Sequence, residues 1–148
     1  LPDTDMTPEQ IAAIQSACAA VLARAAHCAD AHDARGYTDL FAPDARWSRP
    51  GMVMHGHAEI HAFMRDRSPS NVTRHVNGSV WIEVIDADHA RSQSYAVVYR
   101  DAAWSGSGPA RLAGPEIIAD YRDTFRRIAG EWKIQTRDTV VPFSIHAA

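Results

Sequence analysis

The sequence predicts an α+β fold in which helices pack on one face of a curved antiparallel sheet. Apolar residues recur at helical spacing up to residue 65, whereas from Asn71 onward apolar and polar residues alternate as they do in strands. Four strand patterns then follow one another with short breaks, which favours a meander of chain neighbours. The length of 148 residues favours a single domain, residues 1–148, that can bury a core without disulfides.

The first helix is predicted from Pro8 to about Ala29. Thr7 can cap its first turn together with Gln10, and Pro8 suits that turn because its missing N–H would be unpaired there. An alanine-rich apolar stripe at helical spacing suits close packing against a sheet. The stripe consists of Ile11, Ile14, Cys18, Val21, Leu22, Ala25 and Ala29.

Shorter elements are predicted between this helix and the long strands. They are a second helix at about Ala34–Phe41, a short strand at Asp44–Arg49, a turn at Pro50-Gly51 and a third helix at His57–Arg65. The joint after the first helix carries Asp30 and Asp33. A charged joint of this kind is usually solvated, and the alternative is that one carboxylate faces inward.

The four long strands are predicted at Asn71–Asp86, Arg91–Ala102, Glu116–Ile128 and Glu131–Val141. In the first of them the even positions are largely apolar, and the odd positions carry Thr73, His75, Asn77, Ser79 and Trp81. The odd face favours a lined cavity, with an exposed sheet face as the alternative for His75. The even face, with Val72, Val76, Val80, Ile82 and Val84, needs more protein or a partner subunit, so we expect a homo-oligomer.

A formal net charge of −3, with no basic cluster, argues against nucleic acid or an anionic membrane as a partner. No apolar run approaches the length of a membrane span, and the first ten residues lack the features of an export signal. Cys18 and Cys28 lie about 280° apart around the predicted helix, so they cannot form a disulfide with each other. We therefore expect reduced thiols and a cytoplasmic protein.

Several short motifs, in their order along the chain, resemble the SnoaL-like family of the nuclear transport factor 2-like superfamily. They are the DxxD of Asp30 and Asp33, LFAPDARW from Leu40, Gly56 before the third helix, RHVNGSVW from Arg74, and DYRDTF with GEWKIQTR from Asp120 to Arg137. The resemblance covers nearly the whole chain and implies a cone of curved sheet, closed by three helices around a deep pocket. It does not by itself imply an activity, because the superfamily contains enzymes and non-catalytic binding domains.

The resemblance is nearest to scytalone dehydratase, bile-acid 7α-dehydratase and γ-hexachlorocyclohexane dehydrochlorinase, whose catalytic dyad is an Asp after the first helix and a His early in the long strand. It places Asp30 and His75 at these positions, with Asp33 as the alternative carboxylate. It also places Arg137 at an arginine of the last two enzymes. The resembled enzymes use no metal, and they are trimers, whereas many relatives are dimers. The resemblance thus implies an Asp–His general base in a trimer or dimer.

Two departures from these enzymes concern the general acid. The second pocket histidine of scytalone dehydratase is missing, because the corresponding region reads Gln93-Ser94-Tyr95-Ala96, and the first helix lacks the tyrosine of the dehydratases. An acid that assists the leaving group must therefore come from elsewhere, and Tyr95 and Tyr121 are the candidates.

The remaining candidate site residues are expected to bind the substrate. Arg137 would hold a carboxylate or stabilise developing negative charge, the alternative being an ion pair with Asp123 or Asp138. Aromatic residues would line the pocket, although most aromatic residues of the chain belong to an ordinary core. The candidates for substrate contact are Tyr37, Trp47, Phe63, Trp81, Asn77 and Phe125.

The sequence thus predicts a cofactor-independent lyase, either dehydratase-like or releasing a small aldehyde, that acts on a hydrophobic, aromatic or polycyclic small molecule. The alternatives are an isomerase or cyclase of the ketosteroid-isomerase kind and a non-catalytic small-molecule-binding domain. His55, His57 and His61 form an HxHxxxH pattern whose spacing permits zinc. Because no neighbouring carboxylate or cysteine completes a ligand set, we predict no metal site.

Overall fold

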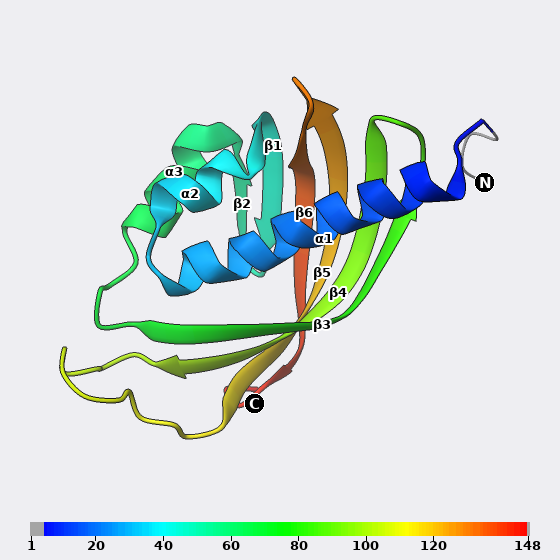
Figure 1. Ribbon diagram of the computed structural model, residues 1–148. Coiled ribbons are helices and arrows are strands. Elements are labelled where there is room, and N and C mark those ends of the chain that lie inside the picture. The colour runs from blue at the N-terminus through cyan, green and yellow to red at the C-terminus, as the bar shows by residue number, and fades with distance from the viewer. Residues whose placement is uncertain (1–4, 148) are drawn as a thin grey trace.

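The computed structural model describes residues 5–147, which form a curved six-stranded sheet with three helices against its inner face (Figure 1). The predicted α+β class is confirmed. The elements are α1 (Pro8–Asp30), α2 (Ala34–Asp39), β1 (Phe41–Arg49), β2 (Met52–His55), α3 (Gly56–Arg65), β3 (Val72–Val84), β4 (His89–Asp101), β5 (Pro115–Ile128) and β6 (Glu131–Ser144).

The strand order in the sheet is β2-β1-β6-β5-β4-β3. The predicted meander is present, because β3 to β6 pair antiparallel with their chain neighbours. β1 joins the meander by pairing parallel to β6, with Trp47 opposite Arg137. The sequence did not predict β2, because its four residues are too few to show an alternating pattern. β2 follows a turn at Gly51 and pairs antiparallel with β1.

α1 begins and ends close to its predicted bounds. The Thr7 hydroxyl accepts from the Gln10 backbone N–H at 3.3 Å, and the Gln10 side chain accepts from the Thr7 N–H at 2.8 Å, which completes the capping box. Its buried residues Cys18, Leu22 and Ala25 join the core between helix and sheet. Both cysteines are buried free thiols.

The apolar character of α1 differs from the sequence expectation. Contrary to the expectation from sequence, α1 is long and apolar enough, by length and composition alone, to meet the criterion for a membrane-crossing helix. Its many alanines account for the apolar composition. Here the helix lies along β3 (Figure 1), where the Gln15 amide donates to the Ile82 carbonyl at 3.2 Å.

β3 contains a bulge that reverses its alternation. Gly78 pairs with Tyr95 and Trp81 with Gln93, so three steps along β3 match two along β4, and Ser79 adopts a left-handed conformation with φ of 48°. Odd residues therefore face inward before the bulge and even residues after it. The predicted outer positions of Ile82 and Val84 are wrong, since both are buried inside the chain's own fold.

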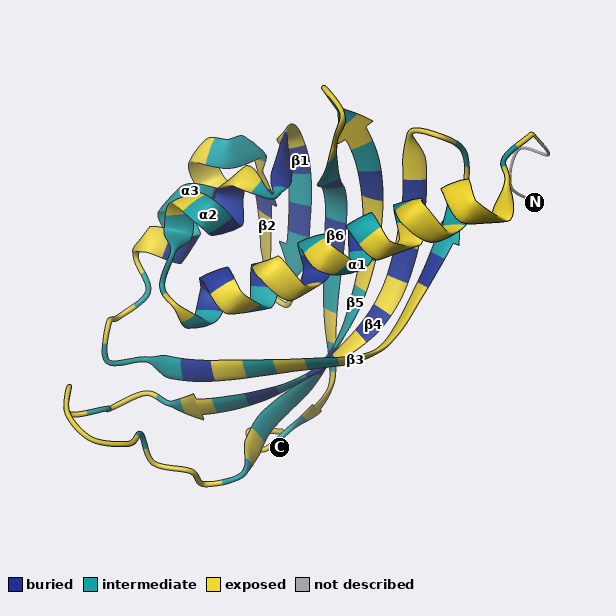
Figure 2. Cartoon of the chain, in the orientation of Figure 1, coloured by how far each residue is buried: buried dark blue, intermediate teal, exposed yellow. Residues whose placement is uncertain are grey.

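Exposed apolar residues still gather on the outer face of the sheet, where buried and exposed positions alternate along the strands (Figure 2). They are Val76, Trp81, Tyr95, Val140 and Phe143. A face of this kind is what the expected homo-oligomer needs, and the oligomeric state stays a prediction.

The bulge yields a prediction about stability. Ser79→Gly should leave the free energy of unfolding unchanged or raise it by up to about 1 kcal/mol, because glycine adopts positive φ without strain. Ser79→Val should lower it by about 1–2 kcal/mol, because a β-branched residue is strained there. Urea denaturation of both variants measures the two effects. Equal stability of the glycine and valine variants would argue against the left-handed bulge.

Candidate active site

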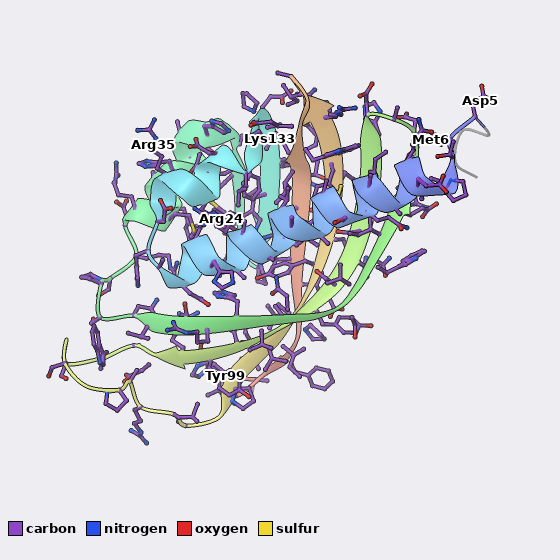
Figure 3. The ribbon with its side chains drawn as sticks, viewed as in Figure 1. Asp5, Met6, Arg24, Arg35, Tyr99 and Lys133 are labelled. Carbon is purple, nitrogen blue, oxygen red and sulfur yellow. The ribbon has the colours of Figure 1, made fainter. Side chains whose placement is uncertain are left out.

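A cavity of about 160 Å³ lies between the helices and the inner face of the sheet. Figure 3 draws the side chains of the helices and of the sheet as sticks. The lining comes from all three helices and from every strand except β2. Because the sheet curves, residues of β1 and of β3, at opposite sides of the sheet, line the same cavity.

His75 and Asp30 form a hydrogen-bonded pair at the wall of this cavity. The His75 Nδ1 and the Asp30 Oδ1 are 2.6 Å apart, and the His75 backbone N–H donates to Asp30 Oδ2 at 3.0 Å. The Thr73 hydroxyl adds a third donor to Asp30 Oδ1 at 2.8 Å. Because an ionised carboxylate only accepts, it fixes the imidazole proton on Nδ1 and leaves the lone pair on Nε2. The His75 side chain is 18% exposed and lines the cavity.

Asp30 is held in its ionised form. Burial of the carboxyl group raises its pKa, but the hydrogen bonds from the His75 ring, the His75 backbone and Thr73 outweigh burial, so the net pKa is lowered. Asp33, the alternative carboxylate, instead caps α2 by accepting from the Gly36 N–H at 2.8 Å. The carboxylate that meets the imidazole is therefore Asp30.

Arg137 lies at the cavity wall, but its donors are largely occupied. Its Nε and one terminal nitrogen donate to the two Asp123 oxygens at 2.7 and 3.0 Å, and the other donates to the Tyr37 hydroxyl at 3.3 Å. The Asp123 alternative named from sequence is thus present, as a buried pair rather than a surface pair. A substrate carboxylate would have to compete with this bidentate contact.

Two neutral phenols border the same wall. Burial raises the pKa of Tyr121 to about 12, and burial also raises the pKa of Tyr37, in both cases against the opposing charge of Arg137. The Arg137 guanidinium lies 4.3 Å from the centroid of the Tyr121 ring. At neutral pH both phenols keep their protons, so each can act as a proton donor.

The predicted pocket-lining set divides into two groups. Tyr37, Trp47, Phe63 and Asn77 line the cavity. The Asn77 amide donates to the Leu22 carbonyl at 3.3 Å, while its buried Oδ1 has no hydrogen-bond partner among the described residues and is available to a ligand hydroxyl.

Three predicted site residues lie elsewhere. Trp81 is 59% exposed on the outer face, because the bulge at Ser79 turns it away from the cavity. Tyr95 is 52% exposed on the same face, since the inward residues of β4 are the even ones, and it is not a candidate acid. Phe125 is buried in the hydrophobic core and does not line the cavity.

Sequence reasoning missed three arginines of the cavity lining, namely Arg49, Arg67 and Arg100. For Arg49 a signal existed, because it follows Trp47 by two residues in a predicted strand and so shares its face. The other two needed knowledge of how α3 ends and where β4 crosses the cavity.

The three histidine side chains of the HxHxxxH pattern do not come together at one site. The His57 ring nitrogen Nε2 lies 2.8 Å from the Phe41 carbonyl oxygen, to which it donates. Within residues 5–147, no group of three histidine, cysteine or acidic side chains is placed to bind a metal ion.

The Asp30 pKa yields a prediction about pH and stability. A carboxyl group whose pKa is lowered by folding contributes stability above its ordinary value of about 3.8, and this contribution is lost as pH falls through the folded pKa. Asp30→Asn should therefore cost about 1–3 kcal/mol of unfolding free energy at pH 7 and less near pH 3. Denaturant titrations at both pH values test this. An equal cost at both would contradict an ionised, stabilising Asp30.

The buried ion pair yields a second prediction. Asp123→Asn should lower the free energy of unfolding by about 3–5 kcal/mol, because it leaves the Arg137 charge buried without a counter-ion. The double variant Asp123→Leu/Arg137→Met should lose less than this single variant, since it removes both charges together. Urea denaturation of the two proteins makes the comparison, and a larger loss in the double variant would count against the pairing.

Comparison with known proteins identifies one family. The family model described as SnoaL-like domain matches residues 10–138. A comparison with curated proteins found no match.

Solved structures with the same fold include those of the following three proteins. A protein of Novosphingobium aromaticivorans, provisionally named scytalone dehydratase, has a TM-score of 0.81 and 15% identity, covering 96% of this chain and 93% of its own. A type 2 hexachlorocyclohexane dehydrochlorinase has a TM-score of 0.78 and 15% identity, covering 96% and 94%. ActVI-ORFA of Streptomyces coelicolor has a TM-score of 0.72 and 19% identity, covering 88% and 98%. At these identities the likeness is one of fold.

Proposed function

The chain belongs to the SnoaL-like family, and we propose that it is a cofactor-independent lyase that uses His75 as a general base on a hydrophobic small molecule. The observation that carries the proposal is the 2.6 Å contact between His75 and Asp30, at the wall of a cavity lined mainly by apolar and aromatic side chains. An imidazole that is oriented by a carboxylate and shielded from bulk water is suited to proton abstraction.

The first step of the proposed reaction is proton transfer to the unprotonated nitrogen of His75. Nε2 takes a proton from a substrate carbon next to a carbonyl group, and Asp30 stabilises the imidazolium through the Nδ1–H. The electrons of the broken C–H bond form a carbon–carbon double bond as the β-substituent leaves.

The second step is protonation of the leaving group. We assign this role to Tyr121, because it lines the cavity and keeps its proton at neutral pH. A departing hydroxyl that takes this proton leaves as water, and the tyrosinate is then reprotonated by the His75 imidazolium. The nearby Arg137 charge stabilises the tyrosinate in the interval.

The size of the cavity narrows the class of substrate. Its volume of about 160 Å³ is close to that of an engineered protein cavity that holds benzene. Tyr37 and Trp47 pack with ring centroids 5.4 Å apart, and Phe63 meets Trp47 edge to face at 5.4 Å, which forms an aromatic wall. We therefore favour substrates with one or two aromatic rings over larger polycycles.

The test separates proton abstraction from departure of the leaving group. One- and two-ring aromatic ketones without a leaving group are incubated in deuterium oxide, and uptake of deuterium at the carbon beside the carbonyl is measured by mass spectrometry. His75→Ala should reduce uptake about 10²–10⁴-fold, and Asp30→Asn should also reduce it strongly.

A matched control exists at the β3–β4 turn. His89 and Asp86 form a similar pair, with 2.9 Å between Nδ1 and Oδ1, but both side chains are well exposed outside the cavity. His89→Ala should leave deuterium uptake unchanged. If the His75 and His89 variants exchange equally, the general-base role of His75 is refuted.

Product mass decides the reaction class. With the corresponding β-hydroxy ketones, a lyase forms products lighter by one water or by a small aldehyde, whereas an isomerase or cyclase forms products of unchanged mass. A protein that binds these ketones without deuterium uptake or product would support the non-catalytic alternative.

A further inference from the structure

Among the described residues that line the cavity, arginine is the only charged type apart from histidine. Arg49, Arg67, Arg100 and Arg137 all contribute to its surface, together with His75, whereas no aspartate or glutamate of residues 5–147 does. Guanidinium groups beside a small apolar cavity lose part of their hydration. A negatively charged ligand in the cavity would therefore stabilise them.

The four arginines differ in their partners. Arg137 is neutralised by Asp123, and Arg100 is paired with Glu116 at 2.6 Å. Arg67 donates to the Ala29 carbonyl at 2.7 Å and weakly to Thr73 at 3.4 Å. Arg49 has no hydrogen bond or ion pair among the described residues.

Arg49 is held in place by aromatic rings instead. Its guanidinium carbon lies 4.8 Å from the centroid of Phe63 and 5.7 Å from that of Trp47. Cation–π contacts hold the charged group but use none of its N–H donors. The side chain is half-buried at the end of β1 and lines the cavity that His75 lines from β3.

Burial and neighbouring positive charges also act on Arg49 and Arg67. Burial lowers the pKa of Arg49 and of Arg67, and the neighbouring charge of Arg100 lowers both further, so these groups repel one another. A bound anion would relieve both the burial penalty and the repulsion.

We propose that Arg49 binds a carboxylate group of the substrate and thereby orients the reacting carbon toward His75. The planar donors of a guanidinium match the two oxygens of a carboxylate. The substrate class becomes an aromatic carboxylic acid of one or two rings. This inference rests on the proposed function, since an anion bound here is a substrate only if the His75 site is catalytic. It also transfers the carboxylate-binding role expected of Arg137 to an arginine whose donors are free.

The test uses binding rather than turnover. 2-Naphthoate and its neutral counterpart 2-naphthamide are titrated into the protein by isothermal calorimetry at pH 8. The parent should bind the carboxylate about ten- to a hundredfold more tightly than the amide. Arg49→Gln should remove this preference while leaving amide binding unchanged.

Two further variants complete the design. Arg46→Gln is the matched control, because Arg46 lies on the same strand but pairs outside the cavity with Asp138 at 2.8 Å, so its preference should be that of the parent. Arg49→Lys keeps the charge without the planar fork and should show an intermediate preference.

Three results would overturn the inference. They are equal binding of carboxylate and amide by the parent, no binding of the carboxylate at millimolar concentration, or a carboxylate preference that Arg49→Gln leaves unchanged. The first two do not depend on a variant that folds, and none of the three bears on the deuterium exchange that tests His75. The anion site and the lyase proposal can therefore fail separately.

Discussion

The arrangement of helix and sheet depends on the hydrogen bonds that the Asp30 carboxylate accepts. Asp30 is the last residue of α1, and its carboxylate accepts three hydrogen bonds from β3, two from His75 and one from the buried Thr73. Each hydrogen bond to a charged group contributes about 1.5–3 kcal/mol, and the donors would be left unpaired without it. The same three contacts that fasten the helix to the strand also orient the imidazole, so the fold and the candidate site share one interaction.

β3 is an edge strand, and α1 covers its open side. The edge is tied to the helix at both ends, by the Asp30 contacts near its start and by the Gln15 amide on the Ile82 carbonyl near its end. These contacts occupy backbone groups of the edge that a strand of another chain would need for pairing. Between these two points the bulge at Ser79 changes which residues face inward. The first half of β3 thus supplies the cavity wall, and the second half supplies the core beneath α1.

Much of this architecture could be read from the sequence, because periodicity reports which face of an element is buried. The alternation placed Thr73, His75 and Asn77 together correctly, since β3 is regular up to Gly78. The expectation for Trp81 failed because a period of two assumes an unbroken strand, although Gly78-Ser79 inside a strand pattern is itself a signal for a bulge.

Other features of the site could not be predicted from the periodicity of the sequence. The pairing of Asp30 with His75 was expected only through the family resemblance, because no periodicity joins residues 45 positions apart. Tyr95 and Tyr121 could not be told apart, since the inward face of each strand depends on its register with its neighbours. Similarly, the sequence showed Arg137 and Asp123 as possible partners but not that their contact is buried and bidentate.

Charge balance links the base to the rest of the cavity. The imidazolium that proton abstraction creates would share the cavity with Arg49 and Arg67, for which the described residues provide no ion pair, while Asp30 contacts the imidazole from one side. A substrate carboxylate on Arg49 would add negative charge on the opposite wall, within the same low-dielectric space. Proton transfer to His75 would then be more favourable with an acidic substrate in the cavity than with a neutral one. In this arrangement the substrate supplies part of the electrostatic environment that its own reaction requires.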